Sequence, residues 1–308
     1  MILKALVYSV LFMALIITAY SLYLSVSDYY TPTRIFILNE TLNQDINQPS
    51  YSGLLQFYPN MRFDKRQLSY NIESSCDNKK RVNMMKAFEY LKNITGLLSF
   101  YESSNPSISI LCQEAKEEPI RKYFIVGEGG PISIVNTSSF YVIQKGKIFL
   151  FYKDVECDNY NIELHELLHV FGFDHSSNIN SIMYNTTECY QIVTNDIINE
   201  MKRLYSIPEL PDLTFDNGKA SVQQGKYLNF TVEVKNIGLK SARAMLEVYS
   251  DGKKFYEYDL GDMDYGEGKM VWGITSLPSR KIDKIEFMLV NGEELNKENN
   301  IISLFPAS

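Results

Sequence analysis

The stretch that decides the fold of this 308-residue chain is residues 165–175, His165-Glu166-Leu167-Leu168-His169-Val170-Phe171-Gly172-Phe173-Asp174-His175. The whole sequence has three histidines, and all three lie in this stretch. Positions i and i+4 share one face of a helix, so His165 and His169 can present their imidazoles to the same metal ion. Glu166 lies about one helical step further round, where it can reach a metal-bound water. The alternative is an ordinary amphipathic helix whose histidines bind nothing.

Two further residues complete a zinc-binding pattern. Gly172 can adopt a positive φ, so we expect it to end the helix and turn the chain back. His175 then returns as the third ligand and leaves the fourth position open, as in catalytic zinc sites. The sequence therefore predicts a zinc ion held by His165, His169 and His175, with Glu166 as the catalytic base. A structural zinc site is the competing interpretation, but such sites usually have four protein ligands.

A methionine-containing segment, Ser181-Ile182-Met183-Tyr184, follows the third histidine. Together with residues 165–175 it resembles the metzincins, zinc endopeptidases that share HExxHxxGxxH and a turn with a methionine. Ser176 after the third histidine and Tyr184 after Met183 are similar to the matrixin branch. The resemblance implies that Met183 lies in a turn beneath the metal.

The resemblance extends over about residues 61–207 and implies an α+β domain, a twisted mixed sheet with the active-site helix beneath it. Hydrophobic periodicity predicts strands, helices and a hairpin in an order that suits this fold. The predicted strands are 67–72, 107–111 and 123–126, and the hairpin consists of 131–142 and 147–152 around Gly146. The predicted helices are 81–95, 161–171 and 196–205. A strand near 130–145 is either an exposed edge that binds a peptide substrate or an internal strand.

The N-terminus carries an uncharged, largely apolar run over residues 5–26, directly after Lys4. A helix of ~20 such residues crosses a bilayer. We therefore expect residues 1–26 to form a transmembrane signal anchor with its N-terminus in the cytoplasm. A cleaved signal peptide is the alternative. The bulk of the chain would be extracellular on a single-pass membrane protein, or secreted if the segment is cleaved.

Cysteines and sequons agree with export. The chain has an even set of cysteines, which suits two disulfides: Cys76, Cys112, Cys157 and Cys189. We expect the pairs Cys157–Cys189, around the active-site helix and the methionine turn, and Cys76–Cys112. Free buried thiols are the alternative. Asn-x-Ser/Thr sequons predict a glycoprotein and occur at Asn39, Asn93, Asn136, Asn185 and Asn229.

Two segments have sequence patterns that predict their structure or ligands only weakly. Residues 27–60 show no persistent helical period and are predicted to be a linker or short pre-segment. The acidic residues Asp154, Glu156 and Asp158 predict a solvated loop, and the alternative is a calcium ion held by their hard oxygen ligands.

The C-terminal part changes in character after Pro208-Glu209-Leu210-Pro211. Short alternating runs between Gly and Asn turns predict a β-sandwich of about 100 residues over 208–308. This part resembles the CARDB domain, an immunoglobulin-like module. The residues that carry the resemblance are 210–213, 234–238 and 291–300. It implies an accessory module with a cell-surface or protein partner.

The net charge of −7 and the pI near 5.2 provide no basic patch that would favour nucleic acid. Together, the motifs predict a membrane-tethered, extracellular zinc endopeptidase of protein or peptide substrates. In it, Glu166 would assist the attack of a zinc-bound water on the peptide bond. The alternative is a cell-surface adhesion or recognition protein that keeps the zinc but does not cleave.

Overall fold

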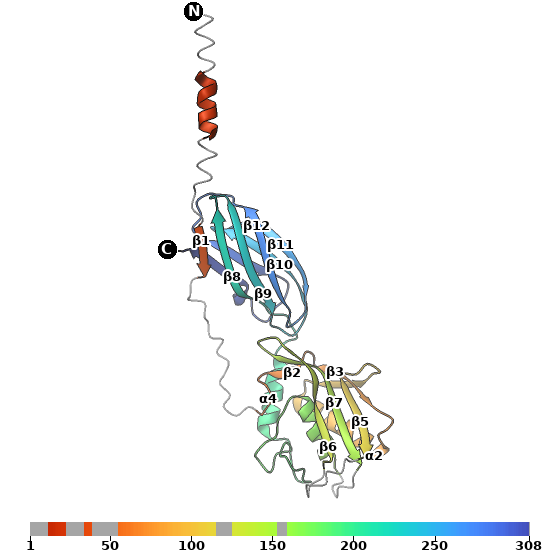
Figure 1. Cartoon of the computed structure of the whole chain (residues 1–308). Coiled ribbons are helices and arrows are strands. Elements are labelled where there is room, and N and C mark those ends of the chain that lie inside the picture. Colours follow the sequence, from red (N-terminus) through yellow and green to blue (C-terminus); the bar gives the residue numbers. More distant parts are fainter. Residues whose placement is uncertain (1–11, 23–33, 39–54, 115–124, 153–158, 308) are drawn as a thin grey trace, which may run out of the picture.

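The computed structural model describes residues 12–22, 34–38, 55–114, 125–152 and 159–307. A mixed α/β domain and a β-sandwich lie end to end, and the N-terminal helix projects from the far end of the sandwich (Figure 1). Residues 12–22 are helical and exposed. Within the described ranges, no helix has both the length and the apolar character needed to cross a membrane. Residues 1–11 and 23–26 of the predicted span lie outside these ranges.

The first domain is built on a mixed sheet, as expected. Five strands pair in parallel in the order β2-β7-β5-β3-β4, and β6 adds to β7 in antiparallel orientation. The strands are β2 (Met61–Phe63), β3 (Gln67–Ile72), β4 (Ser99–Glu102), β5 (Ile108–Glu114), β6 (Gly127–Asn136) and β7 (Tyr141–Tyr152). The prediction of 67–72 matches β3, whereas β2 and β4 were not expected.

The predicted hairpin is wrong in its turn. Strand β7 runs straight through Gly146, and the chain reverses between β6 and β7 at residues 137–140. A Cβ on Gly146 would lie 2.3 Å from Cγ1 of Val170, so glycine at this position makes room for the active-site helix rather than for a turn. The predicted strand at 123–126 also fails in its described part, because residues 125–126 precede β6 without strand geometry.

Helix α2 (Asn78–Thr95) covers the sheet and starts three residues earlier than predicted. It ends at Gly96, whose φ of 64° places it in the left-handed region, as expected. The predicted buried stripe is partly wrong, because Val82 and Met85 are 48% and 52% exposed while Met84 is fully buried. A spacing of three residues drifts by about 60° per step around a helix, so a stripe of that spacing leaves the buried face.

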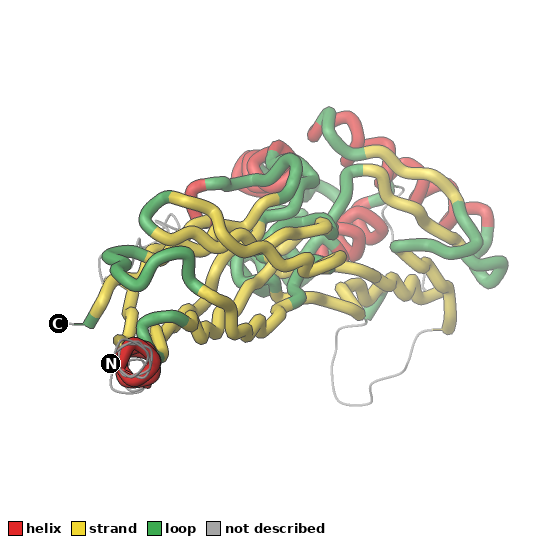
Figure 2. The backbone as a smooth tube through the Cα atoms, turned by 90° about the horizontal axis from the view of Figure 1, so that it is seen from above, coloured by secondary structure: helices red, strands yellow, loops and turns green. Residues whose placement is uncertain are grey.

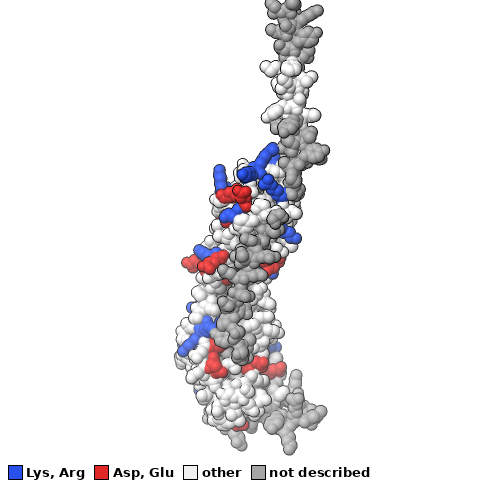
Figure 3. Space-filling view, turned by 90° about the vertical axis from the view of Figure 1, so that its left-hand side faces the viewer, with Lys and Arg blue, Asp and Glu red and all other residues white. Residues whose placement is uncertain are grey.

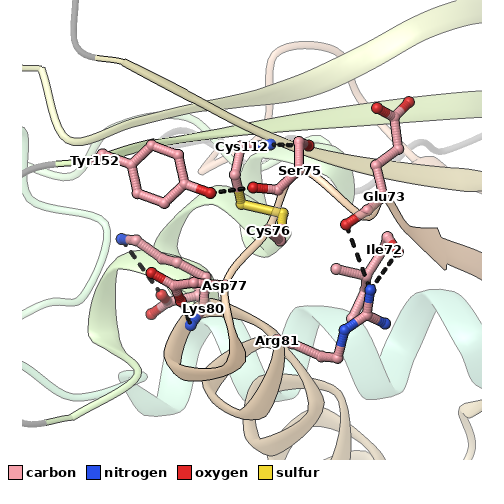
Figure 4. The surroundings of a disulfide bond; sticks show 10 residues. Ile72, Glu73, Ser75, Cys76, Asp77, Lys80, Arg81, Cys112 and Tyr152 are labelled. Carbon is pink, nitrogen blue, oxygen red and sulfur yellow. Dashed lines mark hydrogen bonds and ion pairs between the residues drawn. A yellow bond between two sulfur atoms is a disulfide. The ribbon is translucent and has the colours of Figure 1, made fainter.

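One predicted disulfide is present. Cys76 and Cys112 are bonded and link the start of α2 to β5 (Figure 4). Ser75 reinforces the link: its hydroxyl accepts a hydrogen bond from the Cys112 N–H at 3.2 Å, and its carbonyl accepts one from the Tyr152 hydroxyl.

Other predictions fall on residues that the structure does not describe. Cys157 is one of them, while Cys189, its predicted partner, is disulfide-bonded. The candidate calcium ligands Asp154, Glu156 and Asp158 also lie outside the described residues.

The second domain is an antiparallel β-sandwich, as predicted. Its strands form two layers, β12-β9-β8 and β11-β10-β13-β14, and Figure 2 shows them with the N-terminal helix seen end-on beside them. The elements are β8 (Leu213–Gln223), β9 (Tyr227–Asn236), β10 (Ala242–Ser250), β11 (Lys253–Met263), β12 (Gly268–Ser276), β13 (Ile285–Val290), η2 (Glu298–Asn300) and β14 (Ile301–Pro306).

The N-terminal strand β1 (Arg34–Leu38) joins this sandwich. Its first half pairs with β8 and its second half with β14, so β1 connects the two layers. Phe36, at the crossover, is fully buried in the sandwich core. The prediction that 27–60 is only a linker is therefore wrong for these residues. The mixed α/β domain is inserted between the first two strands of the sandwich.

The two domains are in direct contact. Phe140 and Val142 of the first domain are buried with Leu239 of the second in a small apolar cluster. The Thr137 hydroxyl donates a hydrogen bond to the Ile237 carbonyl at 2.8 Å, beside this cluster. The turn between β6 and β7 thus docks on one end of the sandwich.

Candidate active site

Helix α3 (Asn161–Val170) positions two of the three histidines, and every residue in it is buried. The Asn161 amide anchors its first turn by donating to the carbonyl of Glu188 at 3.0 Å. Gly172 ends it as predicted: its φ is 86°, and its N–H donates to the His169 carbonyl at 2.9 Å. A Cβ on Gly172 would lie 2.5 Å from the Met61 sulfur, so the turn requires glycine for space as well as conformation.

The three histidines converge through their Nε2 atoms. Nε2 of His169 lies 3.0 Å from Nε2 of His165 and 3.3 Å from Nε2 of His175. Nδ1 of His165 faces the Ile182 carbonyl at 2.6 Å, and Nδ1 of His169 faces the Phe173 carbonyl at 2.7 Å. A carbonyl oxygen only accepts hydrogen bonds, so both Nδ1 atoms carry the proton and both Nε2 atoms present lone pairs.

This arrangement fits a zinc ion. Two lone pairs 3.0 Å apart repel each other unless a cation lies between them. Two nitrogens at ~2.05 Å from a tetrahedral zinc would be about 3.3 Å apart, close to the observed separations. Burial lowers the pKa of His165 to about 4 and also lowers that of His169, which keeps both rings neutral. Neutral imidazole is the form that binds metal.

The methionine turn supports the site through hydrogen bonds to Ser176 and His165. Met183 is fully buried, and its carbonyl accepts a hydrogen bond from the Ser176 N–H at 2.7 Å. The Ser181 hydroxyl accepts one from the Met183 N–H at 3.2 Å. Because the preceding residue, Ile182, provides the carbonyl that orients His165, this turn fixes the tautomer and the direction of a ligand ring.

Glu166 is 5% exposed and lies against strand β6. Burial raises the pKa of its carboxyl to about 8, and a hydrogen bond from the Gly129 backbone acts in the opposite direction. A Cβ on Gly127 would lie 2.6 Å from Oε1 of Glu166, and one on Gly129 would lie 2.2 Å from the Glu166 carbonyl oxygen. These glycines let β6 approach the helix. Their role was not predicted, although the run Gly127-Glu128-Gly129-Gly130 is unusual for a strand.

Comparison with known proteins agrees with this geometry. Residues 62–206 match the matrixin family. This segment is matrixin-like. The match suggests a zinc metallopeptidase, and the histidine triad is the group of described residues placed to hold the metal.

For the second domain, a solved CARDB domain from Pyrococcus furiosus, determined in complex with di-metal ions, matches at 22% identity with a TM-score of 0.26. The match covers 32% of this chain and 89% of that domain. It is the module that the C-terminal sequence resembles. No curated protein matches the chain.

Strand β6 is one edge of the matrixin-like sheet, and β4 is the opposite edge. Among the described strands it pairs with β7 alone, which favours the edge interpretation over an internal strand. Ile132 and Ile134 on β6 are 64% and 37% exposed. Beside this edge, Gly129 and Ile134 line one side of a groove of about 510 Å³, and Phe57 and Asp174 line the other.

The residues just before the predicted start of the domain form the second wall of that groove. The Phe57 N–H donates to the Gly172 carbonyl at 2.8 Å, and the Asp174 N–H donates to the Leu55 carbonyl at 2.6 Å. The Phe57 ring stacks on the His169 ring, with centroids 5.8 Å apart. Residues 55–57, which precede the predicted start of the domain at 61, thus hold the turn between the second and third histidines.

Proposed function

We propose that the chain is a zinc-dependent endopeptidase tethered to the outer face of a membrane. The convergence of three Nε2 atoms beside a buried carboxylate and an open strand edge carries this proposal. His165, His169 and His175 would hold the zinc. When bound, zinc polarises a substrate carbonyl and lowers the pKa of a bound water.

Glu166 would move the proton. Its carboxylate takes a proton from the attacking water while the water oxygen bonds to the scissile carbonyl carbon. The same carboxyl then gives the proton to the amide nitrogen as the C–N bond breaks, and a carboxylic acid and an amine leave.

The free edge of β6 would bind the substrate. An extended peptide can pair with the backbone of an unpaired strand, and such pairing is independent of the peptide sequence. The groove beside β6 runs between Phe57 and Ile134, so it would favour an apolar side chain next to the scissile bond. The proposed substrate class is therefore unfolded or extended protein segments.

An exported location is supported by the Cys76–Cys112 disulfide, because such bonds persist in oxidising compartments. The predicted glycosylation sites Asn93, Asn136 and Asn185 are exposed, and Asn229 is half-buried. Asn39 lies outside the described residues.

A membrane tether is supported by the apolar run at 5–26 and by the charge of the sandwich end from which it leaves. Exposed lysines and arginines lie at this end, where β1 begins, together with a group of acidic side chains (Figure 3), and Lys254 is paired with Glu247 and Glu257. The basic residues are Arg34, Lys226, Lys253, Lys254, Arg280 and Lys281. Basic residues near a bilayer are attracted to anionic lipid headgroups. The sandwich would then act as a spacer that holds the peptidase domain away from the membrane (Figure 1).

A digest of a proteome-derived peptide library tests the activity. Full-length protein in detergent should cleave a subset of peptides, lose this activity after treatment with 1,10-phenanthroline, and regain it when zinc is added back. A protein that binds zinc but cleaves no peptide would instead support the non-cleaving recognition function. Cleavage that persists at full rate without zinc would contradict the proposal.

A further inference from the structure

Three unpaired side-chain oxygens belong to one short segment at the domain junction. In the described residues, five buried side-chain atoms have no hydrogen-bond partner, and three of them are Oε1 of Glu294, Oδ1 of Asn299 and Oδ1 of Asn300. All three are acceptors and fall within seven residues of the sequence. An unpaired buried acceptor is destabilising, so three of them within one segment need a common explanation.

A fourth group, Asp212, belongs to the same cluster. Asn299 donates a hydrogen bond from Nδ2 to Oδ1 of Asp212 at 2.9 Å, and the Leu213 N–H lies 3.4 Å from Oε2 of Glu294. Asp212 and Asn300 are only 7% and 6% exposed. The start of β8 and the segment through η2 thus bring two carboxyls and two amides together from opposite ends of the domain sequence.

Exchanging the oxygen and nitrogen of the Asn299 or Asn300 side-chain amide does not resolve the unpaired oxygens. In Asn299, the exchange of oxygen and nitrogen would place the oxygen against the Asp212 carboxyl. In Asn300, the exchange would place the oxygen against the Leu289 carbonyl, which now faces Nδ2 at 3.4 Å. Either change replaces a hydrogen bond by two opposed acceptors.

Positive charge is also lacking. None of the ion pairs between described residues involves Asp212 or Glu294. Desolvation raises the pKa of both carboxyls; the Asn299 side chain acts against it at Asp212, and the Asn300 side chain, the Leu213 N–H and Lys297 act against it at Glu294. The carboxyls of buried Asp212 and half-buried Glu294 are costly without a cation unless a proton or a metal ion neutralises them.

We propose that Asp212, Glu294, Asn299 and Asn300 form a binding site for a divalent cation of the calcium type. Carboxylate and amide oxygens are the hard ligands that Ca²⁺ prefers, and Ca²⁺ accepts the irregular geometry of such a set more readily than Mg²⁺. Its two positive charges would balance the two carboxylates, and its coordination would occupy the unpaired oxygens. This site is separate from the zinc site and does not depend on the proposed peptidase activity.

The cation would stiffen the junction between the domains. Asp212 follows directly on the connection between the domains, and its carbonyl accepts a hydrogen bond from the Ile237 N–H at 2.7 Å. Leu295, next to Glu294, packs on the apolar cluster that joins the two domains. A cation that links Asp212 to Glu294 therefore ties the incoming chain to the loop that contacts the peptidase domain.

Calorimetric titration of CaCl₂ into metal-stripped full-length protein tests the site. We expect one Ca²⁺ per chain, with a Kd between about 10⁻⁶ and 10⁻³ M. The double variant Asp212→Asn with Glu294→Gln should weaken binding at least tenfold. The matched control, Asp216→Asn with Glu233→Gln, removes the same charge from an exposed and a half-buried position outside the cluster and should bind as the wild type does. No binding by the wild type, or equal binding by both variants, would overturn the proposal.

A second variant covers the case in which the double variant does not fold. Asn300→Asp adds a carboxylate to the cluster, so it should bind Ca²⁺ more tightly and gain more in unfolding temperature from 1 mM CaCl₂ than the wild type does. If the cluster is only a buried polar contact, Asn300→Asp will destabilise the protein equally with and without Ca²⁺. That result would refute the cation site.

Discussion

Phe36 provides a sharp test of the inserted-domain architecture, because it is an N-terminal residue in the core of the C-terminal domain. Its side chain is fully buried where β1 passes from β8 to β14. Truncation of a buried phenylalanine to alanine typically costs about 3–5 kcal/mol. Ile35 on the same strand is 57% exposed, and Ile35→Ala should cost about 0.5 kcal/mol or less. The two neighbouring substitutions therefore form a matched pair.

Amide hydrogen exchange can locate this loss in the molecule. Each 1.4 kcal/mol corresponds to a tenfold change, so Phe36→Ala should speed the exchange of β8 and β14 amides by about 10²–10³-fold. Peptides from β3 and β5 of the matrixin-like domain serve as the internal reference and should change much less. If Phe36→Ala alters β8 and β14 no more than Ile35→Ala does, β1 is not part of the sandwich and the reasoning is refuted. Phe36→Leu gives a milder version should the alanine variant not fold.

Two predictions concern Glu166. Gly127→Ala would place a Cβ 2.6 Å from Cγ and Oε1 of Glu166, so kcat should fall at least tenfold while the amount of bound zinc stays the same. The control Gly292→Ala, whose Cβ would have no atom within 4 Å, should have wild-type kinetics. A Gly127→Ala enzyme with wild-type activity would show that β6 does not position the carboxyl. In zinc-free protein the pKa of Glu166 is raised from 4.5 to about 8, so the stability that the protonated carboxyl provides is complete below pH 4.5 and is lost as the pH rises through 8. Calorimetric unfolding of the chelated proteins should therefore find Glu166→Gln about as stable as the wild type at pH 4.5 and more stable by ~3–5 kcal/mol at pH 8. If the stabilities of the wild type and Glu166→Gln depend on pH in the same way, the raised pKa of the buried Glu166 carboxyl is contradicted.

The site could be predicted from the sequence because its chemistry is local. Helical spacing places His165 beside His169, and a glycine that must turn the chain at 172 brings back His175. The Cys76–Cys112 bond was also predictable, since four cysteines allow only three pairings. In each case the pattern lies within a short stretch or depends on very few candidates.

Contacts between distant segments could not be predicted in this way. The five-residue strand β1 has no alternating pattern, and its partners on β8 and β14 lie more than 180 residues further along the chain. Glycine is typical of turns, but Gly146 lies within β7 and leaves room for Val170 of the active-site helix. Only the packed structure reveals this contact. The groove wall at Phe57 was missed for the same reason, because its partner is the turn at Gly172.

The most direct test of the central claim is the activity of Glu166→Gln at matched zinc content, on a peptide that the wild type cleaves. Glutamine keeps the size of the side chain but cannot accept and return a proton. The variant should contain one zinc per chain, as the wild type should, with kcat/KM lower by about 10²–10⁴-fold. Cleavage at a rate close to that of the wild type, with zinc bound in both proteins, would contradict the role of Glu166 and with it the proposed mechanism.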